Sequence, residues 1–146
     1  MFAMLDQHIV CCLDAIVDPE EKNILLKEME EGGRKVINIS HYEMTQMCGN
    51  MVQVKDGKTG ELCVLMSQKA RDGLSAANRN ELESTYRIVS SDISMIETIG
   101  GGSARCMTIE LFWTASYVYT IPNNQPFYKR PATTTCISDS VIIFTI

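Results

Sequence analysis

A cysteine that directly follows a glycine-rich stretch is the residue best placed for chemistry in this sequence. Residues 99–107 read Ile-Gly-Gly-Gly-Ser-Ala-Arg-Cys-Met, so that Cys106 stands next to Arg105. Glycine adopts positive φ angles and lets a ligand approach the backbone, which makes Gly102 and Ser103 candidate substrate contacts. A neighbouring cation and exposed backbone N–H groups favour the thiolate, the form in which cysteine acts as a nucleophile. The pattern therefore predicts a nucleophilic cysteine at position 106.

Other interpretations of this segment stay open on the residues alone. A glycine-rich loop can be a plain connector, in this case between two strand-like stretches, Ser94–Ile99 and Met107–Phe112. It can also cradle a phosphate, although no Gly-Lys-Ser/Thr follows it in this sequence. For Cys106 itself, the alternative is a small buried residue at the beginning of a strand.

The other five cysteines are predicted to be small buried residues with free thiols. Cys11 and Cys12 are adjacent, and the remaining ones show no repeated spacing. The sequence has no Cys-x-x-Cys pair, and neither His8 nor His41 lies at zinc-ligand spacing from a pair of cysteines. We therefore expect no metal site, no cofactor and the reduced thiols that are typical of the cytoplasm.

Length and charge narrow the class of protein further. The 146 residues are 45% hydrophobic and 21% charged, which is typical of one globular domain, and the net charge is −5. A site for nucleic-acid phosphates needs a basic face, so we expect no nucleic-acid partner. The longest apolar runs fall short of the ~20 residues that span a bilayer, and the start of the chain lacks the basic region of a signal peptide. These features predict a cytoplasmic protein without a membrane partner.

The elements that must position the cysteine form two similar units, each with the order strand–strand–helix–strand. Asp18 caps the first helix, and a pair of glycines ends it. Repeated units bury their hydrophobic faces against neighbours, and about three are needed for stability, so we expect the chain to be part of a larger array. The predicted strands are Met1–Leu5, Ile9–Leu13, Lys35–Ile39, Met51–Val54, Leu62–Met66 and Tyr86–Val89, and the predicted helices span 18–33 and 75–84.

The remaining residues, 113–146, differ from these units in composition. They hold three of the four prolines and end in the β-prone run Val141–Ile146. A final edge strand and an extension without structure both fit this tail. We therefore divide the chain into one α/β part, residues 1–112, and a divergent tail, residues 113–146.

The segment Gly100–Met107 resembles the nucleophile motif of the enzymes that modify guanidino groups, which include arginine deiminases, dimethylarginine hydrolases and amidinotransferases. Within this pentein superfamily it is most similar to the amidinotransferase-like branch that contains the citrulline-utilisation hydrolases. The similarity extends over residues 1–112 through Cys48–Met51, Met66–Gln68 and Val10–Asp14. The resemblance implies an α/β fold, a five-bladed propeller of ββαβ units, of which this chain would supply two blades and the tail.

The resemblance also implies a cysteine-dependent hydrolase or transferase that acts on the guanidino or ureido C–N bond of a small arginine- or citrulline-type amino acid. In that chemistry, Cys106 attacks the central carbon, a histidine transfers protons and carboxylates hold the nitrogens of the substrate. Asn50 falls on a loop that lines the pocket, and Gly102 and Ser103 complete the expected substrate contacts. The alternative for Asn50 is a turn residue with a positive φ angle.

This sequence also departs from the family pattern. The catalytic histidine would be expected just ahead of Met1, and neither His8 nor His41 matches its position. The blades with the substrate-binding carboxylates have no counterpart in the sequence. We therefore expect a C-terminal fragment that is inactive alone and that forms homo-oligomers through exposed apolar edges. The competing hypotheses are a non-catalytic binding domain built from the same units and a small α/β protein whose glycines are a connector.

Overall fold

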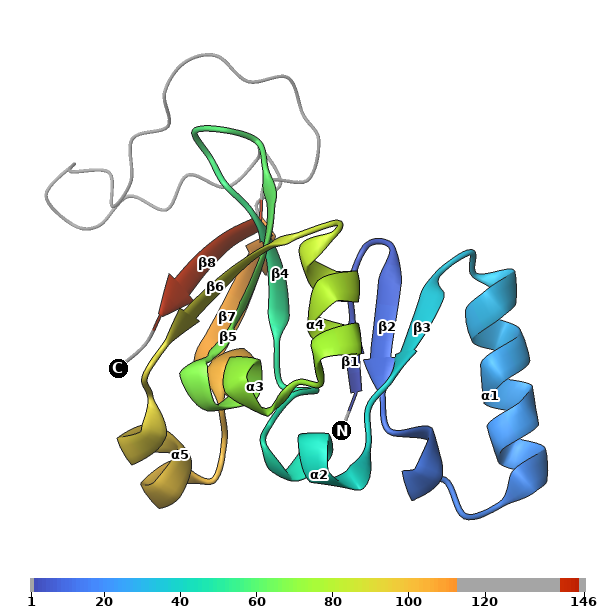
Figure 1. Cartoon of the computed structure of the whole chain (residues 1–146). Coiled ribbons are helices and arrows are strands. Elements are labelled where there is room, and N and C mark those ends of the chain that lie inside the picture. Colours follow the sequence, from blue (N-terminus) through green and yellow to red (C-terminus); the bar gives the residue numbers. More distant parts are fainter. Residues whose placement is uncertain (1, 113–139, 145–146) are drawn as a thin grey trace, which may run out of the picture. The chain divides into compact units, whose positions relative to one another are not determined.

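The computed structural model describes residues 2–112 and 140–144, which are drawn in colour in Figure 1. The chain divides into two compact units, Met1–Met107 and Thr108–Ile146. The first unit is a mixed α/β structure with two small sheets. The division after residue 112 that the composition suggests stays a prediction.

The first sheet has the predicted strand–strand–helix–strand order. Strand β2 pairs with β1 in antiparallel and with β3 in parallel orientation, with Val10 opposite Ile37. The Asp18 side chain accepts hydrogen bonds from the Glu20 and Glu21 N–H groups at the start of α1, as the sequence indicates. The elements are β1 (Phe2–Met4), β2 (His8–Cys11), the 3₁₀ turn η1 (Leu13–Ala15), α1 (Pro19–Glu31) and β3 (Lys35–Asn38).

The second sheet repeats this pattern of pairing. Strand β5 pairs with β4 in antiparallel and with β6 in parallel orientation. Its crossover holds two helices rather than the predicted one, because Ser67 caps an additional helix by accepting a hydrogen bond from the Ala70 N–H at 3.0 Å. The elements are β4 (Val52–Lys55), β5 (Leu62–Ser67), α3 (Gln68–Gly73), α4 (Ala76–Glu83) and β6 (Arg87–Ser91), and α2 (His41–Thr45) lies in the connection between the two sheets.

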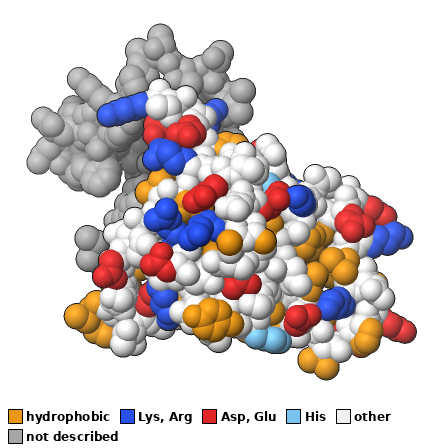
Figure 2. All heavy atoms as spheres, in the orientation of Figure 1, with side chains coloured by type: hydrophobic (Ala, Val, Ile, Leu, Met, Phe, Trp, Pro, Cys, Tyr) orange, Lys and Arg blue, Asp and Glu red, His pale blue; other side chains and the backbone are white. Residues whose placement is uncertain are grey.

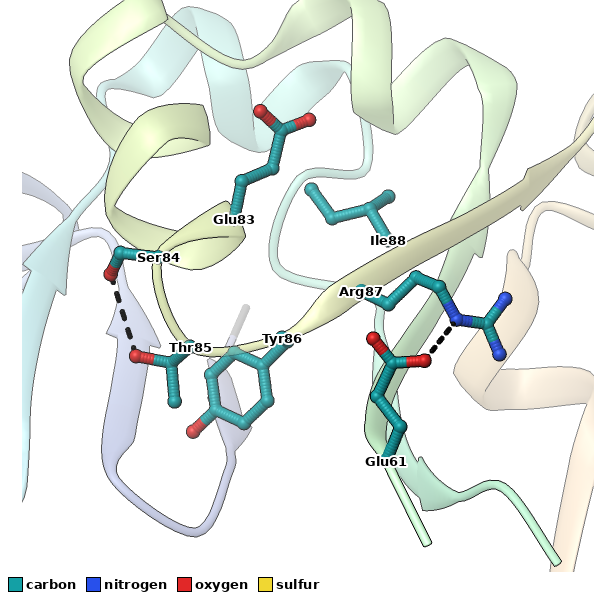
Figure 3. A pocket seen from close by; sticks show the side chains of 7 residues that line it. All are labelled: Glu61, Glu83, Ser84, Thr85, Tyr86, Arg87 and Ile88. Carbon is teal, nitrogen blue, oxygen red and sulfur yellow. Dashed lines mark hydrogen bonds and ion pairs between the residues drawn. The ribbon is translucent and has the colours of Figure 1, made fainter. Parts of the chain in front are cut away.

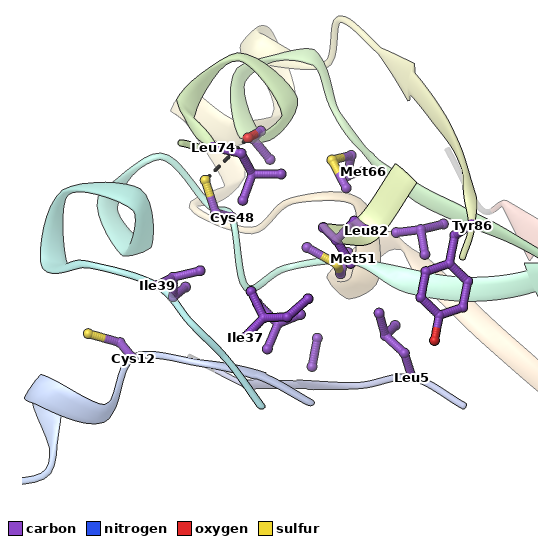
Figure 4. Packing of buried hydrophobic residues seen from close by; sticks show 14 residues of the cluster. Leu5, Cys12, Ile37, Ile39, Cys48, Met51, Met66, Leu74, Leu82 and Tyr86 are labelled. Carbon is purple, nitrogen blue, oxygen red and sulfur yellow. Dashed lines mark hydrogen bonds between the residues drawn. The ribbon is translucent and has the colours of Figure 1, made fainter. Parts of the chain in front are cut away.

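Helix α4 lies between the two sheets, whereas α1 covers the outer face of the first sheet (Figure 1). Every residue of β2 is buried because the strand has a helix on each side. Met29 of α1 packs with Ile9 and Cys11 on the outer face. The main core lies on the inner face, where Leu82 of α4 meets side chains from both sheets, among them Ile37 and Met66 (Figure 4).

The residues ahead of the glycine-rich loop form a helix, so the predicted strand-like stretch Ser94–Ile99 is wrong. Helix α5 (Ser94–Gly100) begins after Asp92, whose side chain accepts a hydrogen bond from the Ser94 N–H at 3.0 Å. It ends at Gly101, whose φ of +70° is the left-handed conformation that glycine adopts readily. A 3₁₀ turn, η2 (Ala104–Met107), then completes the first unit and packs against β5.

The second unit contains an antiparallel pair of strands, β7 (Thr108–Phe112) and β8 (Ser140–Phe144). The remainder of the predicted tail, residues 113–139 and 145–146, lies outside the described residues. None of the helices within the described ranges combines the length and the apolarity that a membrane crossing requires.

Candidate functional site

The predicted nucleophile, Cys106, lies in η2 and is exposed to solvent. Its Sγ accepts a hydrogen bond from Asn50 Nδ2 at 3.0 Å. The alternative of a buried residue that begins a strand is therefore wrong for this cysteine. The structure brings together two residues that the sequence separates by more than fifty positions, and both were predicted as site residues.

Asn50 reaches the cysteine from the connection between α2 and β4. Its side chain is buried, and its backbone N–H donates to the Met47 carbonyl oxygen at 2.8 Å. Among the described non-glycine residues, Met47 alone has a positive φ, so Asn50 is not the left-handed turn residue of the alternative interpretation. The Asn50 Oδ1 atom accepts hydrogen bonds from the Arg105 N–H at 2.8 Å and from the Cys106 N–H at 3.4 Å.

The glycine-rich loop fits closely around the cysteine. A Cβ atom at Gly102 would lie 2.9 Å from the Cys106 Cβ and 3.4 Å from its Sγ, so that any other residue at this position presses on the nucleophile. Ser103 is fully buried, and its hydroxyl donates to Glu97 Oε1 of α5 at 2.6 Å. This bond fastens the loop to the helix that precedes it. Contact of Gly102 or Ser103 with a substrate stays a prediction.

The direction of its pKa shift sets Cys106 apart from Cys11 and Cys48. The Asn50 amide, the Ser103 backbone and the Arg105 charge together hold the pKa of the Cys106 thiol below its ordinary value. Burial instead raises the pKa of Cys11, and it raises that of Cys48 to about 12. Cys12 and Cys63 are buried and free like these two, as predicted, and Cys136 lies outside the described residues.

Neither histidine of the chain is at hydrogen-bond distance from Cys106. His8 is buried, with Nδ1 3.3 Å from the Tyr86 hydroxyl and Nε2 3.1 Å from Glu81 Oε1. His41 lies on the surface at the start of α2, where its Nδ1 is 4.0 Å from the Cys12 Sγ. The described residues thus assemble the nucleophile and the groups that hold it, without a histidine in contact with the thiol.

The predicted site residues lie outside the hollow that the structure shows beside β6. A hollow of about 500 Å³ beside β6 contains the ion pair between Arg87 and Glu61, at 2.8 Å, and includes none of the four predicted site residues (Figure 3). Acidic and basic side chains are interspersed on the face shown in Figure 2. No three His, Cys, Asp or Glu side chains in the described part of the chain are arranged to hold a metal ion.

Two features of the site are not evident from the sequence. The first is that Glu97 anchors Ser103 by a hydrogen bond. The sequence feature that could have indicated this role is that Glu97 is the single acidic residue in the segment that forms α5. The second is the contact of Asn50 with the sulfur, since its motif indicated a residue that lines the pocket. No local pattern signals a contact between such distant segments.

A family of known proteins matches most of this chain. The family described as N,N dimethylarginine dimethylhydrolase, eukaryotic, matches residues 1–113, which include Asn50, the glycine-rich loop and Cys106. No curated protein and no solved structure matches the chain.

Proposed function

This chain belongs to the N,N dimethylarginine dimethylhydrolase family, and from this premise we propose that Cys106 is the nucleophile of a hydrolase that acts on guanidino C–N bonds. The observation that carries the proposal is the exposed Cys106 thiol, which accepts a hydrogen bond from the Asn50 amide. The pKa of this thiol is lowered, whereas the pKa values of the Cys11 and Cys48 thiols are raised. A depressed pKa increases the fraction of thiolate, the reactive form, at neutral pH.

The substrate that we propose is an arginine with two methyl groups on one guanidino nitrogen. The Cys106 thiolate adds to the central carbon and forms a C–S bond, and the C–N bond to the dimethylamino group then breaks. Dimethylamine takes up one proton as it leaves. Water attacks the resulting thiouronium carbon, gives up its protons and displaces the thiolate, so that citrulline is formed and the cysteine is regenerated. Arginine and citrulline, which the similarity to the citrulline-utilisation branch favours, present the same central carbon and are the alternative substrates.

This chemistry needs groups that the described residues do not bring to Cys106. A residue that carries protons supplies ~10²–10⁴-fold of the rate, and a carboxylate must hold the guanidinium near the sulfur. Both histidines have other partners; one carboxylate oxygen of Glu97 accepts from Ser103, and the other is buried without a hydrogen-bond partner among the described residues. We therefore propose that this chain does not turn over alone and is the C-terminal part of a larger site. In that larger protein, the two three-stranded sheets would be two blades of a five-bladed propeller, which their common strand order supports.

The test compares this chain with a version extended upstream by its genomic coding sequence. Both are incubated with N,N-dimethylarginine, arginine and citrulline, and the release of dimethylamine and ammonia is measured. We expect product from the extended version only, lost in Cys106→Ser and retained in Cys63→Ser, a matched change of a buried cysteine. Product from the short chain would overturn the proposal that this chain is inactive alone. The absence of product from both versions would overturn the proposed hydrolase function.

A non-catalytic binding domain is the second candidate. The observation in its favour is the position of both histidines away from Cys106. It predicts that the extended version binds a guanidino compound in calorimetry without releasing an amine, and that Cys106→Ser leaves the affinity unchanged.

A further inference from the structure

We propose that Asn50 is a positioning residue of the reaction, which uses the two ends of its amide to fix the backbone of the nucleophile and to stabilise its sulfur as a thiolate. This inference rests on the proposed function of Cys106 and extends it. It also changes the predicted role of Asn50, from a residue that lines the pocket to one that acts through the cysteine.

The partners of Asn50 fix the orientation of its amide. The backbone N–H groups of Arg105 and Cys106 can only donate hydrogen bonds, so the atom that faces them at 2.8 and 3.4 Å must be the amide oxygen. The amide nitrogen then faces the Cys106 Sγ at 3.0 Å, and it can only donate. The sulfur is therefore the acceptor, and a thiolate is the stronger acceptor of its two protonation states.

Asn50 is itself held rigidly, which a positioning residue requires. Two residues earlier, the Cys48 N–H donates to the Glu43 carbonyl oxygen at 3.1 Å, and the Cys48 Sγ donates to the Ala70 carbonyl oxygen at 3.2 Å. Cys48 and the following Met51 both belong to the main core. Core residues thus flank Asn50 on both sides in the sequence and anchor its backbone, and a side chain held in this way loses little entropy when it orders its partner.

Opposite the amide, the glycine-rich loop limits the other positions that the sulfur can take. A Cβ atom at Gly102 would press on the Cys106 side chain, and the Ser103 backbone helps to lower the pKa of the thiol. The sulfur therefore accepts a hydrogen bond from a neutral donor, and the residue remains exposed, so that a substrate carbon can approach it. A neutral donor stabilises a thiolate without placing a positive charge that would repel a cationic guanidinium substrate.

The test measures the rate at which iodoacetamide alkylates Cys106 as a function of pH, by mass spectrometry of its peptide. Asn50→Asp keeps an oxygen for the two backbone N–H groups, removes the donor to the sulfur and adds a negative charge. We expect the midpoint of its profile to move upward by about one pH unit, so that alkylation at neutral pH falls about tenfold. Asn50→Ala should move the midpoint in the same direction. Asn80→Asp, which adds the same charge on the exposed face of α4, should leave it unchanged.

Circular dichroism establishes whether each variant is folded. If Asn50→Ala does not fold, Asn50→Asp, which retains an acceptor for the two backbone N–H groups, still tests the inference. An unchanged alkylation profile in a folded Asn50→Asp variant would overturn the inference. The outcome is independent of turnover: a shifted profile without amine release from the extended chain rejects the proposed hydrolase but keeps the thiolate-holding role. Amine release from the extended chain together with an unshifted alkylation profile rejects the positioning role of Asn50 and keeps the proposed hydrolase.

Discussion

Cys106 owes its properties to neighbours that are mostly neutral. The Asn50 amide and the Ser103 backbone contribute more to its lowered pKa than the adjacent Arg105 charge, which was the cation that the sequence suggested. This order has a physical reason, since a directed hydrogen bond to the sulfur is shorter and less screened than the charge of an exposed side chain. The sequence predicts a thiolate from both the Arg105 cation and backbone N–H groups; the backbone contribution is the larger of these two, and the Asn50 amide contributes most.

The close fit of the glycine-rich loop leads to a prediction for Gly102→Ala. The added Cβ would lie 2.9 Å from the Cys106 Cβ, so the cysteine or the loop must shift, which we expect to disturb the contact of the sulfur with Asn50. We expect the variant to lose roughly 1–3 kcal/mol of stability, as overpacked sites do, and to alkylate more slowly at neutral pH. Urea unfolding and the alkylation rate measure the two effects.

Gly100→Ala is the matched control in the same loop, because a Cβ at position 100 meets nothing within 4 Å. It should leave the alkylation profile unchanged and alter stability by less than about 1 kcal/mol. Equal effects of the two substitutions would contradict the role assigned to the space at Gly102.

At the scale of elements, predictions succeeded where the signal was local. Helix α1 begins where Asp18 and Pro19 indicate, because both the cap and the proline act within one turn. The sequence pattern of α5 indicates a strand, because a helix of seven residues is too short to show a helical period. What determines it is the Asp92 side chain at its start and Gly101 at its end. The contact of Asn50 with Cys106 was beyond any such signal, because it depends on how distant elements pack.

Glu43 of α2 joins the connection between the sheets to the start of α4. Its carboxylate accepts hydrogen bonds from the Ser40 and Ser75 N–H groups and from Asn78 Nδ2, at 2.7, 2.9 and 2.9 Å. Burial by itself would raise the pKa of this carboxyl, but these bonds outweigh it and lower the pKa to about 2. The ionised form is therefore bound more strongly in the folded than in the unfolded protein.

The sign of the pH dependence follows from this lowered pKa. The stabilisation is complete above the ordinary value of 4.5 and is lost as the pH falls from there toward 2. We expect Glu43→Gln to cost about 3 kcal/mol at pH 7 and much less at pH 3, measured by urea unfolding. Glu28→Gln, on the exposed face of α1, is the control and should cost little at either pH. A cost for Glu43→Gln that does not depend on pH would contradict the prediction.

At the scale of the whole molecule, the first sheet presents an edge that favours association. Among the described strands, β1 pairs only with β2, and its residues Phe2 and Met4 are 49% and 60% exposed. An edge strand with apolar side chains is a template for pairing with another chain. We expect concentration-dependent association in light scattering, reduced by Met4→Lys and unaffected by Val17→Lys, which changes a residue 94% exposed outside the strands. A monomer at high concentration would contradict this expectation.

The position of α4 between the two sheets has a consequence for how the protein comes apart. Stacked repeats with separate cores can unfold one after another, whereas these two sheets share one core through Leu82. They should therefore melt together, in a single cooperative transition. Asn50 lies between Cys48 and Met51, both in that core, so the amide cannot leave the sulfur by local fraying. The Asn50 side of the thiol's activation is thereby tied to the core that the two sheets share, and unfolding of that core should remove it.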